Sequence, residues 1–188
     1  MRELVYYVAV SLDGFIAAPD GSYEPLSRDG DHTDVLTTTY ADAIPAHVLA
    51  AIGATAPGTL FDTVIQGWNS YANAYDVGIT RPYAHLREYV ATRTRHSPPD
   101  GVTFTDDPVA TVKELKAQDG LSIYLCGGGE LAGALLPEID RLILKRHPVA
   151  MGAGIPLFGN SSYQPHAFQR VQEQQFASGV CIAEYTRA

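Results

Sequence analysis

The sequence is poor in positive charge and in cysteine, and each shortage excludes a class of function. Its 188 residues contain 13 Lys and Arg against 21 Asp and Glu, which gives a formal net charge of −8 at pH 7. Nucleic-acid backbones and anionic lipid surfaces are bound by clustered cations, so we expect neither a nucleic-acid partner nor a membrane partner. The only two cysteines, Cys126 and Cys181, lie far apart in the chain and provide neither a disulfide framework nor a paired-cysteine metal motif.

Long apolar runs and metal-binding histidine patterns are also missing. The mean hydropathy is −0.05, and no stretch approaches the roughly 18 to 20 uninterrupted apolar residues of a transmembrane helix. The first apolar run stops at Ser11 and Asp13, before a signal-peptide core would be complete. The six histidines lack the spacings that place two ligands on one helical face. We therefore expect a soluble, cytoplasmic protein with no metal site.

The sequence does contain apolar runs of strand length that alternate with segments of helical spacing. The length and the hydrophobic fraction of 46% are typical of a single domain over residues 1–188. The alternation predicts an α/β fold, a mostly parallel sheet with an antiparallel C-terminal hairpin and flanking helices, and such sheets bind ligands at the carboxyl ends of their strands. Strands are expected at residues 3–10, 59–66, 86–92, 121–126, 139–146, 168–176 and 180–186, and helices within residues 40–52, 68–75 and 130–136. A further helix is expected to begin at Pro108, capped by Asp107, and to end at Gly120. Residues 11–21 and 151–159 are expected to be loops.

Three consecutive glycines, at positions 127–129, stand between an expected strand and an expected helix. Glycine lets the backbone approach a ligand closely, and the free N–H groups at the start of a helix favour an anion such as phosphate. A tight packing turn would have the same pattern, so both interpretations remain open. The spacing to Gly133 is one residue too long for the Rossmann fingerprint, and no Gly-Lys-Ser/Thr follows as a P-loop requires.

Two motifs near the ends of the chain carry a resemblance to a known family. They are Ser-Leu-Asp-Gly-x-Ile-Ala at residues 11–17 and Gly-x-Gly-Ile-Pro-Leu-Phe at residues 152–158, with Tyr-Leu-Cys-Gly-Gly-Gly at 124–129 between them. Over essentially its whole length the chain resembles the dihydrofolate reductase-like superfamily. More narrowly, it resembles the reductase domain at the C-terminus of bifunctional riboflavin-biosynthesis deaminase/reductases and the stand-alone relatives of that domain. The resemblance implies a sheet of about eight strands that binds NADPH.

The resemblance also implies cofactor contacts, residue by residue. The glycine turn and the helix after it would hold the pyrophosphate, the backbone of Ala9 and Ile16 would receive the nicotinamide carboxamide, and residues 92–94 would lie beside the adenosine 2′-phosphate. A guanidinium makes charge-assisted contacts with that phosphate, so Arg93 favours NADPH over NADH unless it is a solvated loop arginine. The expected cofactor-binding residues are Ala9, Ile16, Gly67, Trp68, Thr92, Arg93, Thr94, Gly127, Gly128, Gly129 and Glu130.

One position departs from the family pattern. Relatives carry an arginine at the helix start where this chain has Trp68, in the segment Gly-Trp-Asn-Ser-Tyr at residues 67–71. The tryptophan either stacks on the adenine or packs within the protein. The loss of one cation weakens the argument for the 2′-phosphate without removing it. Residues 20–59, which shape the substrate pocket in the superfamily, are also atypical.

Two polar side chains of the first motif are the candidates for catalysis. Asp13 is the expected proton donor because the motif places it at the mouth of the cleft, and a residue that caps its own turn is the alternative. Ser11 is expected to donate a hydrogen bond to the substrate. Asp34 and Tyr40 are weaker candidates, because nothing in their spacing fixes their direction.

These observations lead to two functional hypotheses. The first is an NADPH-dependent oxidoreductase that transfers a hydride to a small heterocyclic substrate, most like 5-amino-6-(5-phosphoribosylamino)uracil, or to another pteridine-like compound. The second is a regulatory or accessory protein that binds NADP(H) without turnover. The deaminase half of the bifunctional enzymes is absent, because neither H-x-E nor P-C-x-x-C occurs. A homodimer is expected, since relatives dimerise and exposed sheet edges benefit from cover.

Overall fold

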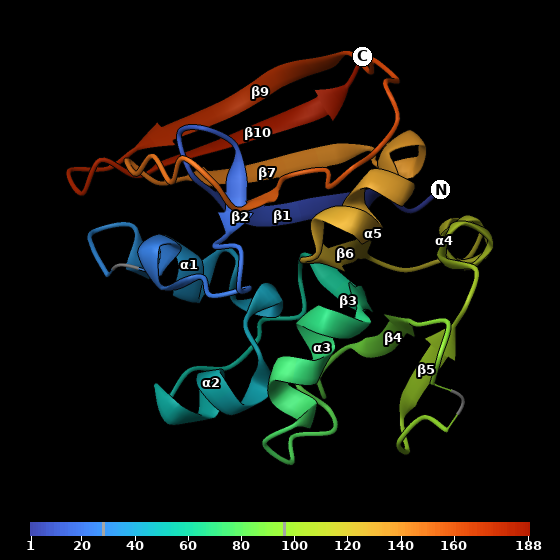
Figure 1. Cartoon of the computed structure of the whole chain (residues 1–188). Helices are drawn as coiled ribbons and strands as arrows, with labels where there is room; N and C mark the ends of the chain where they lie inside the picture. The colour runs from blue at the N-terminus through green and yellow to red at the C-terminus, as the bar shows by residue number, and fades with distance from the viewer. Residues whose placement is uncertain (28, 96) are drawn as a thin grey trace.

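The computed structural model describes residues 1–27, 29–95 and 97–188. Its centre is an eight-stranded sheet with the order β5-β4-β3-β6-β1-β7-β10-β9 (Figure 1). The first six strands in this order run parallel, and β10 runs antiparallel to both β7 and β9. The expected fold class is therefore confirmed. The strands are β1 (Leu4–Val10), β3 (Phe61–Gly67), β4 (Arg87–Ala91), β5 (Val102–Thr105), β6 (Ser122–Cys126), β7 (Arg141–Arg146), β9 (Phe168–Gln175) and β10 (Cys181–Arg187).

Both faces of the central strands are buried, which explains why their sequences are continuously apolar rather than alternating. On one face, Leu4 and Tyr6 of β1 pack with α4 (Pro108–Lys116) and α5 (Gly129–Ala134). On the other face, Val5 and Tyr7 of the same strand pack with residues of the segment between β2 and β3. That segment contains η1 (Glu24–Leu26), α1 (Thr33–Thr38), η2 (Ala41–Ala43) and α2 (Ala46–Ala51).

The helix expected within residues 40–52 is in fact two short pieces. Pro45 adopts an extended conformation, with φ −56° and ψ 140°, between η2 and α2. Proline has no N–H group to donate to a preceding turn, so the chain restarts its helix after Pro45 instead of running through it. Helix α1 was not expected from the sequence. The expected cap of α4 is present, since Asp107 Oδ1 accepts a hydrogen bond of 2.9 Å from the backbone N–H of Ala110.

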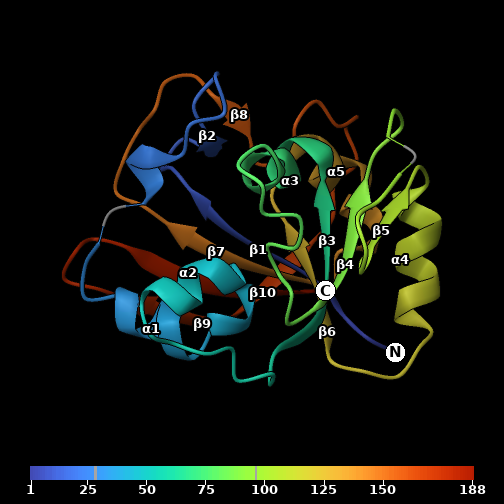
Figure 2. The ribbon, with the colours of Figure 1, turned by 90° about the horizontal axis from the view of Figure 1, so that it is seen from below.

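Two short strands bring the family motifs together. Phe15–Ala17 (β2) pairs antiparallel with Ile155–Pro156 (β8) in a separate two-stranded sheet, although both segments were expected to be loops. In Figure 2 this pair lies at the same end of the molecule as α3 (Trp68–Tyr75), toward which the carboxyl end of β3 points. Within the ranges described, no helix has the length and apolar character needed to cross a bilayer.

Candidate active site

Asp13 joins two loops at the carboxyl ends of β1 and β7. Its carboxylate accepts hydrogen bonds from the hydroxyl of Ser11 (2.6 Å) and from the backbone N–H groups of Met151 (3.0 Å) and Gly152 (2.6 Å). The Ser11 hydroxyl and the two backbone groups lower the pKa of Asp13 to about 2. Asp13 is therefore ionised at neutral pH and has no proton to donate. The arrangement favours the structural alternative for this residue over the expected role as acid.

The side chain of Ser11 is also engaged in hydrogen bonds within the protein. Its hydroxyl donates its only proton to Asp13 and also accepts a hydrogen bond of 2.9 Å from the backbone N–H of Phe15. The residue is 2% exposed. The structure therefore uses Ser11 to shape the turn between β1 and β2, and a hydrogen bond to a substrate would require the hydroxyl to leave Asp13. Of the two nicotinamide contacts implied by the resemblance, Ala9 lies in β1 and Ile16 lies in β2.

The glycine turn after β6 combines backbone freedom with close packing. Gly127 and Gly128 have φ angles of +61° and +71°, in the left-handed region that favours glycine. A Cβ on Gly129 would overlap the carbonyl oxygen of Pro156 and lie 2.8 Å from the backbone N of Gly159. Gly129 therefore serves as a packing residue, while the conformation of the first two glycines turns the chain from β6 into α5. The Glu130 side chain, the next in line, accepts a hydrogen bond of 3.3 Å from the amide of Asn160.

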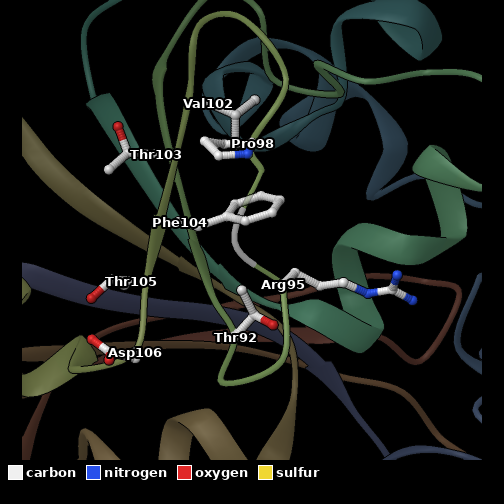
Figure 3. Close-up of a pocket in the computed structure, with 8 residues that line it drawn as sticks. All are labelled: Thr92, Arg95, Pro98, Val102, Thr103, Phe104, Thr105 and Asp106. Carbon is white, nitrogen blue, oxygen red and sulfur yellow. The ribbon is translucent and has the colours of Figure 1, made fainter.

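A cavity of about 390 Å³ opens at the far edge of the sheet, beside β5 (Figure 3). Thr92 contributes to its wall, whereas Arg93 and Thr94 are exposed and do not. Arg95 does line the cavity, and in Figure 3 it lies on the opposite side from Asp106. The lining residues are Thr92, Arg95, Pro98, Val102, Thr103, Phe104, Thr105 and Asp106.

Trp68 packs within the protein and supports Arg95. Its ring lies 5.6 Å from Tyr71 and meets Phe104 edge to face at 6.0 Å, as measured between centroids. The guanidinium carbon of Arg95 lies over the Trp68 ring, 4.6 Å from its centroid, which is a cation–π geometry. Trp68 thus holds an arginine from a neighbouring loop.

Sequence reasoning missed Arg95, although a signal was present. The chain reads Thr-Arg-Thr-Arg at residues 92–95, so a second arginine stood next to the chosen one. The single tryptophan is a further reason to look for a cation nearby, because guanidinium groups stack on aromatic faces. The contact joins two segments that are far apart in the sequence, so no local pattern could have fixed it.

Solved structures define the class of fold. At a TM-score of 0.74 and 20% identity, the chain superposes on a protein of Shewanella sp. PV-4 assigned to riboflavin biosynthesis, covering 100% of this chain and 99% of that one. It superposes on the deaminase/5-amino-6-(5-phosphoribosylamino)uracil reductase of Thermotoga maritima with a TM-score of 0.68 at 14% identity, covering 100% and 57%. Dihydrofolate reductase of Enterococcus faecalis, complexed with NADP(H), gives 0.65 at 14% identity and covers 98% and 96%. These likenesses define a dihydrofolate reductase-like fold.

Sequence comparison then identifies the family. The model of the RibD C-terminal domain matches residues 2–182, so the chain belongs to that family. YwjB of Bacillus subtilis (strain 168), an uncharacterized protein, is 33% identical over 166 residues, which is 84% of this chain and 83% of YwjB. The suspected resemblance is thereby confirmed: the chain belongs to the RibD C-terminal domain family and has a dihydrofolate reductase-like fold.

Proposed function

We propose that the protein is a cytoplasmic, NADPH-dependent reductase of a small heterocyclic compound, most like 5-amino-6-(5-phosphoribosylamino)uracil. The observation that carries the proposal is the Arg95 guanidinium held on Trp68 beside the cavity that Thr92 lines. A guanidinium and a hydroxyl can both donate hydrogen bonds to the 2′-phosphate of the adenosine in NADPH. NADH has no phosphate at this position. Arg95 thus replaces Arg93 as the main reason to expect NADPH.

Other residues of the family pattern complete the proposed cofactor site. The backbone of Gly127 and Gly128 and the start of α5 would receive the pyrophosphate, and the backbone of Ala9 and Ile16 would receive the carboxamide. A bound dihydronicotinamide would supply a hydride. The residues of this chain would position the cofactor and the substrate and enclose them. Asp13 contributes by fixing the loop at residues 151–152 against the loop that leads into β2.

The test of nucleotide preference uses the single tryptophan of the chain as its probe. NADPH and NADH are titrated separately, with Trp68 emission and calorimetry as readouts. We expect NADPH to bind at least ten times more tightly than NADH, and Arg95→Ala to remove most of that difference. Arg93→Ala is the matched control and is expected to keep the preference. Equal affinity for the two nucleotides in the wild type would contradict the proposal.

Turnover is tested separately. NADPH consumption is followed with 5-amino-6-(5-phosphoribosylamino)uracil and with dihydrofolate as substrates. We expect consumption with the first compound and little with the second. Tight NADPH binding without consumption of either would favour the second hypothesis, an accessory protein without turnover. A specific observation supports that alternative: the side chains of Ser11 and Asp13, the two expected catalytic residues, are both engaged in structural hydrogen bonds.

We also propose that the protein forms a homodimer. The sheet ends at β9, an eight-residue strand whose only partner within the described ranges is β10. Val171 of β9 is 56% exposed, and a long edge strand is a surface that a second chain can cover. Sedimentation equilibrium is expected to give twice the monomer mass, and a monomer at micromolar concentration would contradict the proposal.

A further inference from the structure

The chain has three lysines, and two of them are neutralised by carboxylates. Lys113 Nζ lies 3.5 Å from Glu138, and Lys116 Nζ lies 2.7 Å from Asp140. Lys145 differs, because no carboxylate of the described ranges lies within ion-pair distance of its ammonium group, although the residue is half-buried. Removing an ammonium group from water without a counter-charge is costly. A lysine kept in such a place calls for an explanation beyond packing.

Lys145 lies beside the proposed nicotinamide site. It is the β7 residue that pairs with Ala9 of β1 on one side and with Ile182 of β10 on the other. Its Nζ lies 5.9 Å from the centre of the Tyr7 ring, which stacks on Tyr40 at 5.0 Å. The ammonium group therefore belongs to the sheet face opposite α4 and α5, near the carboxyl ends of β1 and β7.

Glu184, a carboxylate on this face, has other partners. Glu184 Oε1 accepts a hydrogen bond of 2.7 Å from the hydroxyl of Tyr40, and Glu184 Oε2 lies 3.5 Å from Arg141. Burial therefore lowers the pKa of Lys145 without compensation, while burial raises the pKa of Tyr7 and of Tyr40 and keeps both phenols protonated. The ionisable group next to Lys145 is Tyr7, and Tyr7 is linked through its stacking on Tyr40 to Glu184 and Arg141. His147, two residues after Lys145, contacts His32 edge to face.

We propose that Lys145 is the acid that protonates the substrate as it is reduced. The inference rests on the proposed reductase function, and it supplies the proton source that Asp13, as a carboxylate, does not. In the step, the substrate carbon of a C=O or C=N bond accepts the hydride, and the electron pair of that bond takes a proton from Nζ of Lys145. The dihydronicotinamide is oxidised and the substrate is reduced. The neutral amine left on Lys145 regains its proton from solvent.

The first test needs no substrate. With only three lysines, protein labelled with 13C at lysine Cε gives three resonances, which Lys113→Arg and Lys145→Arg variants assign. We expect Lys145 to titrate at a lower pH than an ordinary lysine side chain, and its resonance to shift when NADP⁺ saturates the protein, while the Lys113 resonance does not respond to the nucleotide. A Lys145 that titrates as an ordinary lysine, or that does not respond to bound NADP⁺, would overturn the inference.

The second test separates acid chemistry from packing. In single turnover with NADPH and 5-amino-6-(5-phosphoribosylamino)uracil, Lys145→Met is expected to slow hydride transfer by about 100-fold or more, the usual contribution of a general acid. NADPH affinity and thermal stability should be retained. Lys145→Arg keeps a cation that does not release its proton, so it should not restore the rate. Lys113→Met is the control and should behave as the wild type.

The pH profile adds a readout that a structural role would not move. The wild-type rate should fall as the pH rises through the Lys145 pKa measured by NMR, and Lys145→Met should lose this dependence. Wild-type rates in Lys145→Met or Lys145→Arg would overturn the inference and leave the proposed function intact. Absence of nucleotide binding in calorimetry would instead contradict the proposed function, and the NMR titration distinguishes the two failures.

Discussion

The hydrogen bonds of Asp13 give a residue-scale prediction with a defined pH range. Its folded-state pKa of about 2 lies below the ordinary value of 3.8. A lowered carboxyl pKa means that its stabilising effect is complete above the ordinary value and is lost as the pH falls through the folded one. We expect the loop at residues 151–152 to stay protected from amide hydrogen exchange at pH 4 and to open near pH 2.

The matched variant for this prediction is Asp13→Asn. An amide in place of the carboxylate still offers one acceptor oxygen, but it removes the charge that strengthens the bonds from Met151 and Gly152. The protection of these two amides from exchange should be smaller at neutral pH and should no longer change between pH 4 and pH 2. If the variant and the wild type exchange at the same rate, the carboxylate does not hold the loop.

A second carboxylate, Asp42, provides a prediction about stability. It is fully buried and accepts hydrogen bonds from four successive backbone N–H groups, those of residues 58–61. Burial alone would raise the pKa of Asp42, but these bonds outweigh it and lower the pKa. Asp42→Ala leaves the N–H groups without an acceptor, so we expect the free energy of unfolding to fall by about 3 kcal/mol.

Chemical denaturation of Asp42→Ala and Asp42→Asn, side by side, measures this effect. Asparagine retains one acceptor oxygen and should lose less stability than alanine. A loss below about 1 kcal/mol for Asp42→Ala would show that water replaces the carboxylate at the start of β3. Sequence reasoning did not find this anchor, because the aspartate and the amides it caps are separated by α2 and a loop.

At the scale of elements, α5 packs so closely against the loop after β8 that there is no room for a side chain at Gly133. A Cβ on Gly133 would overlap the carbonyl oxygen of Phe158 and lie 3.0 Å from Cβ of Ser161. The obstruction is backbone, which cannot rotate away as a side chain can. We expect Gly133→Ala to destabilise the protein by about 1 to 3 kcal/mol despite the higher helix propensity of alanine.

Gly67→Ala is the control for stability, since its Cβ would meet only Leu131, at an ordinary 3.9 Å. Thermal unfolding should place Gly133→Ala well below the wild type and Gly67→Ala close to it. If Gly133→Ala were as stable as the wild type, α5 would be free to move away from the loop. That outcome would also weaken the case for a fixed turn at Gly127 and Gly128.

The elements also show what sequence patterns can predict and where they stop. The central strands were predictable because both of their faces are buried, and the cap by Asp107 because it is formed within four residues. The pairing of β2 with β8 was not predictable, since two and three residues leave no periodicity to detect. The same limit applies to the residues of the site. Consecutive glycines indicate a backbone turn in the sequence itself, whereas the contacts of Arg95 with Trp68 and of Lys145 with Tyr7 come from segments far away in the chain.

At the scale of the whole molecule, the sheet order collects the parts of the proposed site. Strand β1 lies between β6 and β7, so the Ser11–Asp13 loop, the glycine turn and the loop of Met151 follow three neighbouring strands. The cavity beside Arg95 lies at the β5 edge, on the other side of β3 and β4. A dinucleotide extended from β1 to that edge would contact most of the parallel part of the sheet.

Nucleotide binding should therefore stabilise the molecule as a whole. A ligand that binds only the folded state at 100 times its Kd adds about 2.7 kcal/mol to the free energy of unfolding. For a chain of this size that corresponds to a rise in Tm of roughly 5 to 11 °C. At the same concentration NADH should give a much smaller rise, and Arg95→Ala should reduce the NADPH effect to that of NADH while Arg93→Ala retains it. If Arg95→Ala kept the wild-type difference between the NADPH rise and the NADH rise, the cation stacked on Trp68 would not read the 2′-phosphate, and the basis for NADPH preference would have to lie elsewhere on the same edge of the sheet.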